Sequence, residues 1–592
     1  MSLFSNPYPL TDLAAASIDG STEQGHYDYI VVGGGTAGCV LANRLSEDPD
    51  VKVLLLEGGN ARLSWATRVP LLSTNFMGDE NTAYNWPSAP TTGLADSRSL
   101  NIVCGKGLGG GSAINSMNYT RGLPLEYDLW SKDGRKGWSF NEIKDYFKKS
   151  EKFVSTPKGT HHGTDGEWIV RDMGDPYFPT AHACVEACVS LGLPYTDDIN
   201  DPNAPPSVCG KFDCTIDLSG HRNSTFNVFL PQALVSKRKS HLHICTGAVV
   251  SALDIEDDAN HLQAVKGVSF RAATGTDEKV YHARALREVI LCAGAIATPQ
   301  ILLLSGIGPS NKVKKPLKKE LLAVGENLVN RQDHLGMGIM YNVPTADSLH
   351  IIQKSRLRAI VELFRYIAFG EGLFLAPVSQ ISIHVDSNRI NDSGHIIPSK
   401  PTDPIRPPDL EVLPIHFNYS DPPIPFEDGV FSLKVGLMRP ASRGSVSLAS
   451  ENPFDRPTCD LAFLTDPADF IVMRKGIKFA KRIGEKMREQ GMNLEELYMP
   501  DSESDADLDA FVQKTARTTY HYGCTCRMAP ENDPRPGVVD DELRVHGISN
   551  LRIADCSIFP DILSTHLQAP VVMIAEKCAD MIKVDQHRSC EA

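Results

Sequence analysis

The sequence predicts an α/β protein in which a Rossmann-like nucleotide-binding domain is joined to an α+β domain with an antiparallel sheet. A strand–glycine turn–helix–strand unit lies near the N-terminus, and alternating strand patterns occur in the middle of the chain. The 592 residues also exceed what one core holds, because single hydrophobic cores stop growing at roughly 250–300 residues. We therefore expect two domains.

The N-terminal unit reads YDYIVVGGGTAGCVLANRLSEDPDVKVLLLEGG and predicts a strand at 29–32, a helix, and a strand at 51–56. Apolar residues recur at helical spacing after the glycine turn, and they predict one face that packs on the sheet. They are Ala37, Val40, Leu41 and Leu45.

The glycine turn has the form of a dinucleotide site. Gly33, Gly35 and Gly38 form G-x-G-x-x-G, and Glu57 follows 19 residues after the last glycine, at the end of the next strand. The first glycine permits the tight turn, the second lets backbone amides approach a pyrophosphate, and the third lets helix and strand pack closely. The helix N-terminus, which opens with Thr36 and Ala37, then faces the phosphates, and the Glu57 carboxylate can accept hydrogen bonds from a ribose diol. A glutamate here argues against a 2′-phosphate, and the motif suits both FAD and NAD.

The remaining chain gives weaker patterns. Segments 431–437 (FSLKVGL) and 444–450 (GSVSLAS) alternate as strands of an antiparallel sheet do, and the acidic run at 501–509 predicts a solvated surface loop. No apolar run approaches the ~20 residues that a membrane span needs.

Charge and cysteine content narrow the class of partner. With 59 basic and 73 acidic residues the formal charge is −14, which disfavours nucleic acids and anionic membranes as partners because both recruit basic patches. The N-terminus lacks secretory features and the fourteen cysteines have no regular spacing, so we expect free thiols and a cytoplasmic location. A leader segment upstream of this sequence would instead make the protein a secreted one.

Three further stretches resemble motifs of a known family. GKGLGGGSAINSMNYTRG (105–122) and GAIATPQILLLSGIGP (294–309) resemble the two signatures of the glucose-methanol-choline (GMC) oxidoreductases. The C-terminal run that begins HYGCTCRMAP at 521 resembles the closing segment of the same family, and the likeness extends from about 27 to about 582. The resemblance implies an alcohol-oxidase-like enzyme with a Rossmann-like FAD-binding domain and an α+β substrate domain.

The resemblance also implies where FAD is held. It implies that the glycine-rich stretch with Gly107, Gly109, Gly110 and Gly111 passes over the flavin, with Asn115 beside the ring. Ile114 stands where some relatives carry a histidine bonded to the flavin, so we expect noncovalent FAD. Val249 matches a position beside the adenine, and Asp555 and Ser557 match residues near the ribityl and pyrophosphate groups. For Asp555 a helix-capping or turn role is the alternative.

The same resemblance implies that the two domains are each built from several separate segments of the chain. We expect the FAD-binding domain at 1–160, 220–335 and 515–592, and the substrate domain at 161–219 and 336–514.

His521 and His566 each open a motif that resembles one carrying the family's catalytic pair. Hydride leaves a carbinol carbon readily only if the O–H proton is removed with it, and a neutral imidazole suits that step. We expect His521 to be the general base and His566 to hold the alcohol oxygen. A helix should follow, with Pro570 in its first turn and an apolar face. That face comprises Val571, Ile574, Ala575, Cys578 and Ile582.

Two segments depart from the family pattern. HYGCTC places Cys524 where the family usually has glycine, and VGENLVNRQDHL (324–335) carries extra residues relative to V-G-x-N-L-x-D-H. His521, Cys524 and Cys526 together suggest a metal site. Two cysteines separated by a single residue do not match the spacing of zinc sites, however, so we expect no metal.

The predicted reaction is oxidation of a primary alcohol to an aldehyde by hydride transfer to flavin N5, with O2 as acceptor and H2O2 as second product. One alternative is a dehydrogenase of the same fold that passes electrons to a quinone or an artificial acceptor, including a choline-dehydrogenase-like enzyme. Another is a hydroxynitrile-lyase-like enzyme without net redox turnover, and a third is a flavin-binding protein without catalysis. No carboxylate for a choline-like cation is evident from the sequence, which disfavours choline.

Overall fold

The computed structural model carries side chains and describes most of the chain. The residues described are 7–18, 24–61, 64–73, 80–132, 134–156, 159–257, 263–274, 278–313, 324, 333–398 and 400–591. Most of the segment 324–335, for which we predicted extra residues, lies outside them.

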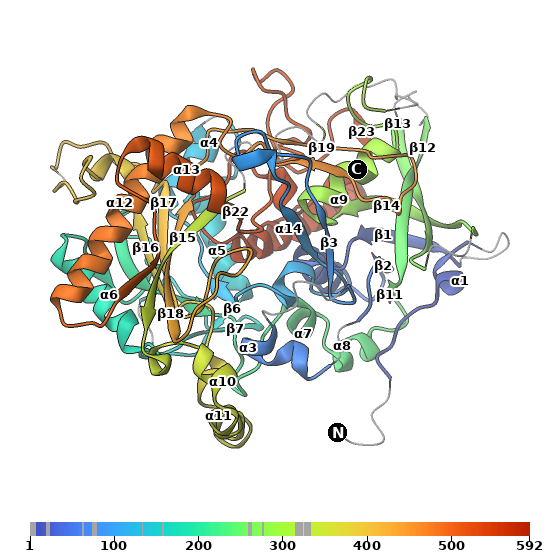
Figure 1. Cartoon of the computed structure of the whole chain (residues 1–592). Helices are drawn as coiled ribbons and strands as arrows, with labels where there is room; N and C mark the ends of the chain where they lie inside the picture. The colour runs from blue at the N-terminus through green and yellow to red at the C-terminus, as the bar shows by residue number, and fades with distance from the viewer. Residues whose placement is uncertain are drawn as a thin grey trace.

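The first sheet is the predicted nucleotide-binding sheet (Figure 1, right). Its four parallel strands lie in the order β11-β2-β1-β14, and β14 continues antiparallel into β13 and β12, as in a Rossmann-like fold. The strand bounds are β1 His26–Val32, β2 Val53–Glu57, β11 Leu242–Thr246, β12 Ala248–Asp257, β13 Gln263–Ala272 and β14 Tyr281–Leu291. Short strands β23 (Ile548–Ser549) and β24 (Leu551–Ile553) pair with β13 and β14.

Helix α2 (Thr36–Leu45) follows the glycine turn as predicted, but nearly every residue of it is buried rather than one face. The long C-terminal helix α14 (Gln568–Glu591) packs against α2, so the side that faces away from the sheet is covered too. The apolar face predicted for α14, Val571 through Ile582, is buried in the same core.

The second sheet is largely antiparallel and lies beside the first (Figure 1, left). Its strand order is β21-β15-β18-β17-β16-β9-β8, and β22 also pairs with β15. The bounds are β8 Tyr195–Thr196, β9 Val208–Lys211, β15 Leu335–Val343, β16 Ile381–Val385, β17 Leu410–Ile415, β18 Gly429–Leu437, β21 Glu495–Tyr498 and β22 Arg517–Thr518. Strands β17 and β18 are buried along their whole length, because α12 (Pro467–Glu489) packs on the sheet.

Strands of the two sheets alternate along the sequence, so the chain passes between the sheets several times. A smaller four-stranded sheet has the order β5-β10-β7-β6, with bounds Asn118–Tyr119, Asp213–Cys214, Trp168–Asp172 and Glu151–Phe153. The domain boundaries given above stay a prediction.

Three local predictions need correction. The strand expected at 51–56 begins at Val53, and 444–450 forms only β19 (Ser445–Ser447), which pairs with β20 (Thr458–Asp460) outside the large sheets. The acidic run at 501–509 is not all loop, because α13 begins at Asp505 and ends at Thr515. Ser504 caps this helix, and acidic residues in a first turn are favoured by the helix dipole.

The thirteen cysteines that the structure describes are free thiols and most are buried. None of the described helices combines the length and the apolar character that crossing a bilayer requires.

Candidate active site

The glycine turn between β1 and α2 has the geometry that a dinucleotide site needs. Gly33 has φ +100°, and a Cβ on Gly38 would lie 1.9 Å from the Gly33 carbonyl oxygen, so both positions require glycine. At Gly35, in contrast, the nearest atoms to an added Cβ are 3.9 Å away. A Cβ could therefore be added at the second glycine without a clash, and it would lie before the N-terminus of α2, where a pyrophosphate is held in this motif.

The second glycine-rich stretch lies directly on this turn. Gly109 N–H donates to the Gly34 carbonyl at 2.8 Å, and a Cβ on Gly110 would come within 2.8 Å of Gly35 Cα. Thr36 Oγ1 accepts from Ser112 N–H at 3.2 Å, which ties the 3-10 turn η3 (Gly110–Ala113) to the start of α2. Gly111 lies within this turn near Thr36 and Ile114 caps its C-terminal end, while Ala37 is buried in the core.

Glu57 connects the two glycine stretches. Its carboxylate accepts backbone N–H groups of Gly34 at 2.8 Å, Gly59 at 2.7 Å and Gly107 at 3.1 Å. A carboxylate offers about four acceptor positions, so one is left for a ribose hydroxyl. The observed contacts are structural, and the role toward a ribose stays a prediction.

Asn115 belongs to a partly buried network that joins η3 to the start of α14. Its Nδ2 donates to Gln568 Oε1 at 2.8 Å, and its Oδ1 accepts from Arg222 Nη1 at 2.9 Å. Arg222, which is buried, also donates to the Ser112 carbonyl. Sequence reasoning missed Arg222 because no motif marks it.

Val249, Asp555 and Ser557 lie at the edges of this region. Val249 is in β12, and its Cγ2 would be 3.5 Å from a Cβ on Gly58, which follows Glu57. Asp555 caps the 3-10 turn η7 (Cys556–Ile558) and accepts from Ser557 N–H at 2.7 Å and Gly294 N–H at 2.8 Å. The capping alternative that we considered for Asp555 is therefore observed in the structure.

The two predicted catalytic histidines come together. His521 follows β22 and His566 lies two residues before α14, and their ring centroids are 4.9 Å apart at an interplanar angle of 77°. Burial lowers the pKa of His521 well below its ordinary value, and neighbouring histidines add to the effect. The His521 ring is therefore neutral at pH 7.

A third histidine, His334, fixes the tautomer of His521. Nδ1 of His334 lies 2.7 Å from Nδ1 of His521, and Nε2 of His334 lies 3.1 Å from the Leu563 carbonyl oxygen. A carbonyl only accepts, so Nε2 of His334 carries the proton, and burial lowers the pKa of this ring to about 3. Nδ1 of His334 is then the acceptor and Nδ1 of His521 the donor. We therefore assign the free lone pair of His521 to Nε2.

His566 has a different partner, a carboxylate of the second sheet. Its Nε2 lies 3.0 Å from Oε1 of Glu411, a fully buried residue of β17. Burial alone would raise the pKa of Glu411, but His566 and Lys434 hold it well below its usual range. Lys434 Nζ is 3.5 Å from the other carboxylate oxygen, and Phe212 packs edge-on against the His566 ring at 5.3 Å. Nε2 of His566 thus donates to a charged carboxylate.

Comparisons with known proteins agree with this geometry. Two family models described as GMC oxidoreductase match residues 27–335 and 440–575. The chain belongs to the GMC oxidoreductase family. It is 35% identical to an oxygen-dependent choline dehydrogenase of Pseudomonas savastanoi pv. phaseolicola, over 95% of this chain and 94% of that protein. A relative with the same description from Burkholderia vietnamiensis is 36% identical, over 94% and 93% of the two chains.

Solved structures extend the likeness. A pyridoxine 4-oxidase from Mesorbium loti matches with a TM-score of 0.80 at 26% identity, over 94% of this chain and 99% of that one. An FAD-dependent oxidoreductase from Chaetomium thermophilum matches with a TM-score of 0.82 at 26% identity, over 95% and 100%. This GMC oxidoreductase is thus an FAD enzyme that acts on CH–OH groups, and the glycine turn before α2, where Gly35 has no side chain to block the helix N-terminus, fits the pyrophosphate of that cofactor.

The departure at Cys524 has a visible consequence in this GMC oxidoreductase. Cys524 has φ +62°, a left-handed conformation that favours glycine and explains why the family usually has glycine there. Cys524 and Cys526 are both fully buried, and burial raises the pKa of both thiols well above the ordinary value. Without a bound metal both thiols are therefore neutral, and the absence of a metal at this place stays a prediction.

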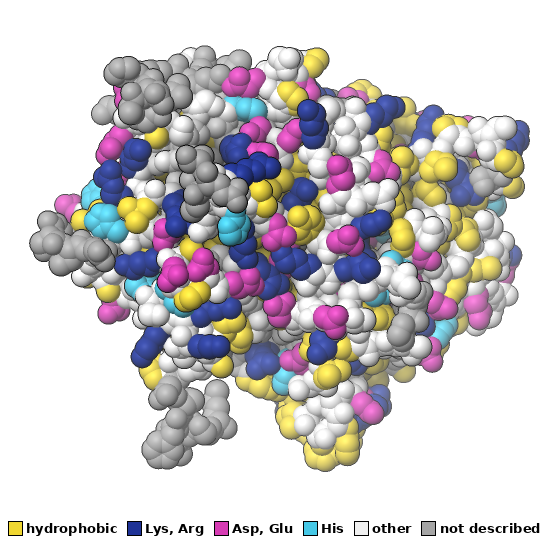
Figure 2. Space-filling model, turned by 180° about the vertical axis from the view of Figure 1, so that it is seen from behind, with side chains coloured by type: hydrophobic (Ala, Val, Ile, Leu, Met, Phe, Trp, Pro, Cys, Tyr) yellow, Lys and Arg dark blue, Asp and Glu magenta, His cyan; other side chains and the backbone are white. Residues whose placement is uncertain are grey.

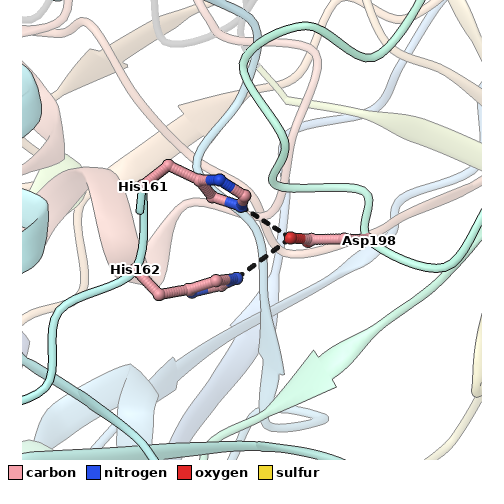
Figure 3. A group of neighbouring side chains, drawn as sticks. All are labelled: His161, His162 and Asp198. Carbon is pink, nitrogen blue, oxygen red and sulfur yellow. Dashed lines mark hydrogen bonds and ion pairs between the residues drawn. The ribbon is translucent and has the colours of Figure 1, made fainter. Parts of the chain in front are cut away.

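Elsewhere, one group within the described part of the chain has the composition of a metal site. Figure 3 shows the rings of His161 and His162 pointing at one carboxylate, that of Asp198. Oδ2 of Asp198 lies 2.7 Å from Nε2 of His161 and 3.0 Å from Nε2 of His162. Ligand atoms around a tetrahedral zinc are ~3.3 Å apart, so these shorter distances are hydrogen bonds. Glu151 contacts the other His162 nitrogen at 3.0 Å, and we interpret the group as an ion-pair network.

Proposed function

We propose that this GMC oxidoreductase oxidises an uncharged primary alcohol to an aldehyde and uses O2 as the electron acceptor, with H2O2 as second product. The observation that supports it most strongly is the pair of imidazoles with unlike hydrogen-bond partners, a histidine for His521 and a carboxylate for His566.

His521 acts as the general base in this proposal. Its Nε2 carries the free lone pair because Nδ1 is engaged by His334, and the neutral ring accepts the proton of the alcohol O–H. A base positioned in this way contributes typically ~10²–10⁴-fold to the rate.

His566 holds the alcohol oxygen. Nε2 is occupied by the Glu411 carboxylate, which leaves Nδ1 as the ring nitrogen that would donate a hydrogen bond to the oxygen as negative charge develops there. A hydroxyl group can donate to only one of the two imidazoles, so one acceptor and one donor fit a single alcohol.

FAD, when bound, supplies the acceptor for the hydride that leaves the carbinol carbon. Gly33, Gly35, Gly38 and Glu57 would hold its dinucleotide part, and Asn115 with Gln568 would lie at the flavin side. Ile114 offers no atom for a bond to the ring, which supports noncovalent binding.

Charge in the centre favours an uncharged substrate. Glu411, which sequence reasoning missed, is a carboxylate that contacts the His566 ring, but it is already paired with Lys434 and His566. A buried ammonium beside it repels a quaternary ammonium group. Choline, named in the descriptions of the relatives, is therefore the second candidate.

The test uses purified holoenzyme and a panel of aliphatic and aromatic primary alcohols with choline included. We expect loss of the ~450 nm flavin absorbance on anaerobic addition of an uncharged alcohol, and peroxide formation at the same turnover when O2 is admitted. Turnover with a dye but no peroxide would favour the dehydrogenase, and faster bleaching by choline would refute the uncharged substrate. An unchanged spectrum with every alcohol would favour a lyase.

A cytoplasmic location stays part of the proposal and is checked by fractionating cells that express the full gene product.

A further inference from the structure

Helix α11 (Arg356–Phe369) projects from the body of the molecule. It follows the short helix α10 (His350–Lys354), and Figure 1 shows both at the lower edge, away from the two large sheets. Among the described residues, one side of α11 contacts the body: Tyr366 donates from its hydroxyl to the Gly220 carbonyl at 3.1 Å, and Glu362 accepts from Leu373 N–H at 2.9 Å. Both side chains are buried.

The opposite side of α11 is an apolar face in contact with solvent. It consists of Leu357, Ile360, Val361, Phe364 and Ile367, which are between 42% and 73% exposed, and the 68% exposed Phe369 at the end of the helix adds a ring 6.0 Å from that of Phe364. Within the described residues, these six are a third of the eighteen large hydrophobic side chains that are exposed, and they lie within one helix. In Figure 2 they fall at the yellow tip of the projection at the lower edge. An exposed apolar patch of this size indicates an interaction surface, whereas single exposed apolar residues scattered over a protein are normal.

Basic residues border this face on both sides. At 100° per residue, the apolar residues from Leu357 to Ile367 occupy an arc about 120° wide, with Arg358 and Arg365 along one edge and Arg356 along the other. Arg358 and Arg365 share the carboxylate of Glu362, at 2.8 and 3.5 Å. From 354 to 371 four basic residues face two acidic ones, a net charge of +2 in a chain of −14.

We propose that α11 binds the surface of a lipid bilayer that contains anionic lipids. The helix lies in the plane of the interface, with the apolar face among the upper acyl chains and the arginines at the phosphates. Fourteen residues of helix span ~21 Å, less than the ~30 Å hydrocarbon core, so α11 lies on the membrane and does not cross it.

A second copy of the chain fits this face less well. In a two-fold symmetric contact the same patch appears on both partners, so the arginines at the edges of one helix would meet those of the other. Anionic headgroups provide the opposite charge. From the whole-chain charge of −14 we predicted that an anionic membrane is a disfavoured partner. That charge is a sum over the whole chain, so it does not show the local basic segment at 354–371.

The test is sedimentation of the purified holoenzyme with vesicles of phosphatidylcholine alone and of phosphatidylcholine with phosphatidylglycerol. We expect binding to the anionic vesicles that weakens as salt is raised, and at least ~10-fold weaker binding for Ile360→Glu/Phe364→Glu. Leu286→Glu/Ile471→Glu is the matched control, because these residues are 61% and 55% exposed outside α11. It should bind as the wild type does.

A second variant, Lys354→Gln/Arg356→Gln, leaves the apolar face intact and should weaken binding to anionic vesicles roughly 10-fold or more. FAD content and alcohol oxidation in solution should stay unchanged in all variants, which separates lost binding from misfolding. No sedimentation with either vesicle, or equal sedimentation of the α11 variants and the control, would overturn the proposal. A dimer in solution that Ile360→Glu/Phe364→Glu dissociates would assign the face to a second copy instead.

Discussion

The nucleotide cradle and the histidine centre of this GMC oxidoreductase are built in different ways. The cradle is made of backbone atoms from two short glycine-rich stretches, in which Gly33, Gly38 and Gly110 are required by close contacts. The histidine centre is made of side chains that lie more than 200 residues apart, from His334 to His566. A site of backbone atoms is specified by local sequence, whereas a network of side chains depends on how distant elements meet.

The largest effect that separates the two regions should come from Gly35→Val. The fold leaves room for a side chain here, but that side chain would occupy the space before α2 where the pyrophosphate fits. We expect folded protein without FAD and without turnover, measured by circular dichroism and by the ~450 nm absorbance. Gly38→Ala, which presses a Cβ to 1.9 Å from an oxygen, should yield little folded protein. Normal FAD content in Gly35→Val would show that the cradle lies elsewhere.

In the histidine centre, Glu411→Gln should keep FAD bound and lower kcat by ~10–10²-fold, because the charge that supports His566 is removed. Steady-state kinetics with an uncharged alcohol measure this. The matched control is Glu362→Gln, a buried glutamate that pairs with arginines of α11, and its kcat should stay within a factor of about two. Equal losses in the two variants would point to a general effect on stability.

His334→Ala should lower kcat about 10-fold, because Nδ1 of His521 loses the acceptor that fixes its tautomer. His334→Asn can place an amide oxygen near the former Nδ1 position and should recover most of the rate. The KM should change little in both variants. If kcat is the same in His334→Asn and His334→Ala, His334 has a packing role and does not fix the tautomer of His521.

Outside both regions, His162 should make stability depend on pH. Burial lowers the pKa of His162, but hydrogen bonds to Asp198 and Glu151 outweigh it and raise the pKa from 6.5 to about 9. The bound proton stabilises the fold fully below about pH 6.5, and this contribution is lost as pH rises through about 9. We expect His162→Gln to cost on the order of 2 kcal/mol at pH 6 and much less at pH 9.5, measured by urea unfolding. A cost that does not change with pH would contradict the ion-pair interpretation.

The contrast between the regions also explains what could be predicted from sequence. The G-x-G-x-x-G turn, Glu57 and the helix after His566 were predicted because their order along the chain reflects their geometry. His334 ends the D-H pair of a family motif and could have been found there, although its neighbours at 325–332 lie outside the described residues. Glu411 and Lys434 gave only a weak signal, a charged residue inside an otherwise apolar strand, and their pairing depends on the register of β17 and β18. The exposed apolar face of α11 could not be predicted from the sequence, because only the fold shows which side of an amphipathic helix faces solvent.

The most direct test of the catalytic assignment is anaerobic single-turnover reduction of bound FAD by an uncharged primary alcohol, in the wild type and in His521→Ala. We expect bleaching at ~450 nm to slow by at least ~10²-fold in the variant, with FAD still bound. Bleaching near the wild-type rate would remove His521 from the base role and contradict the assignment.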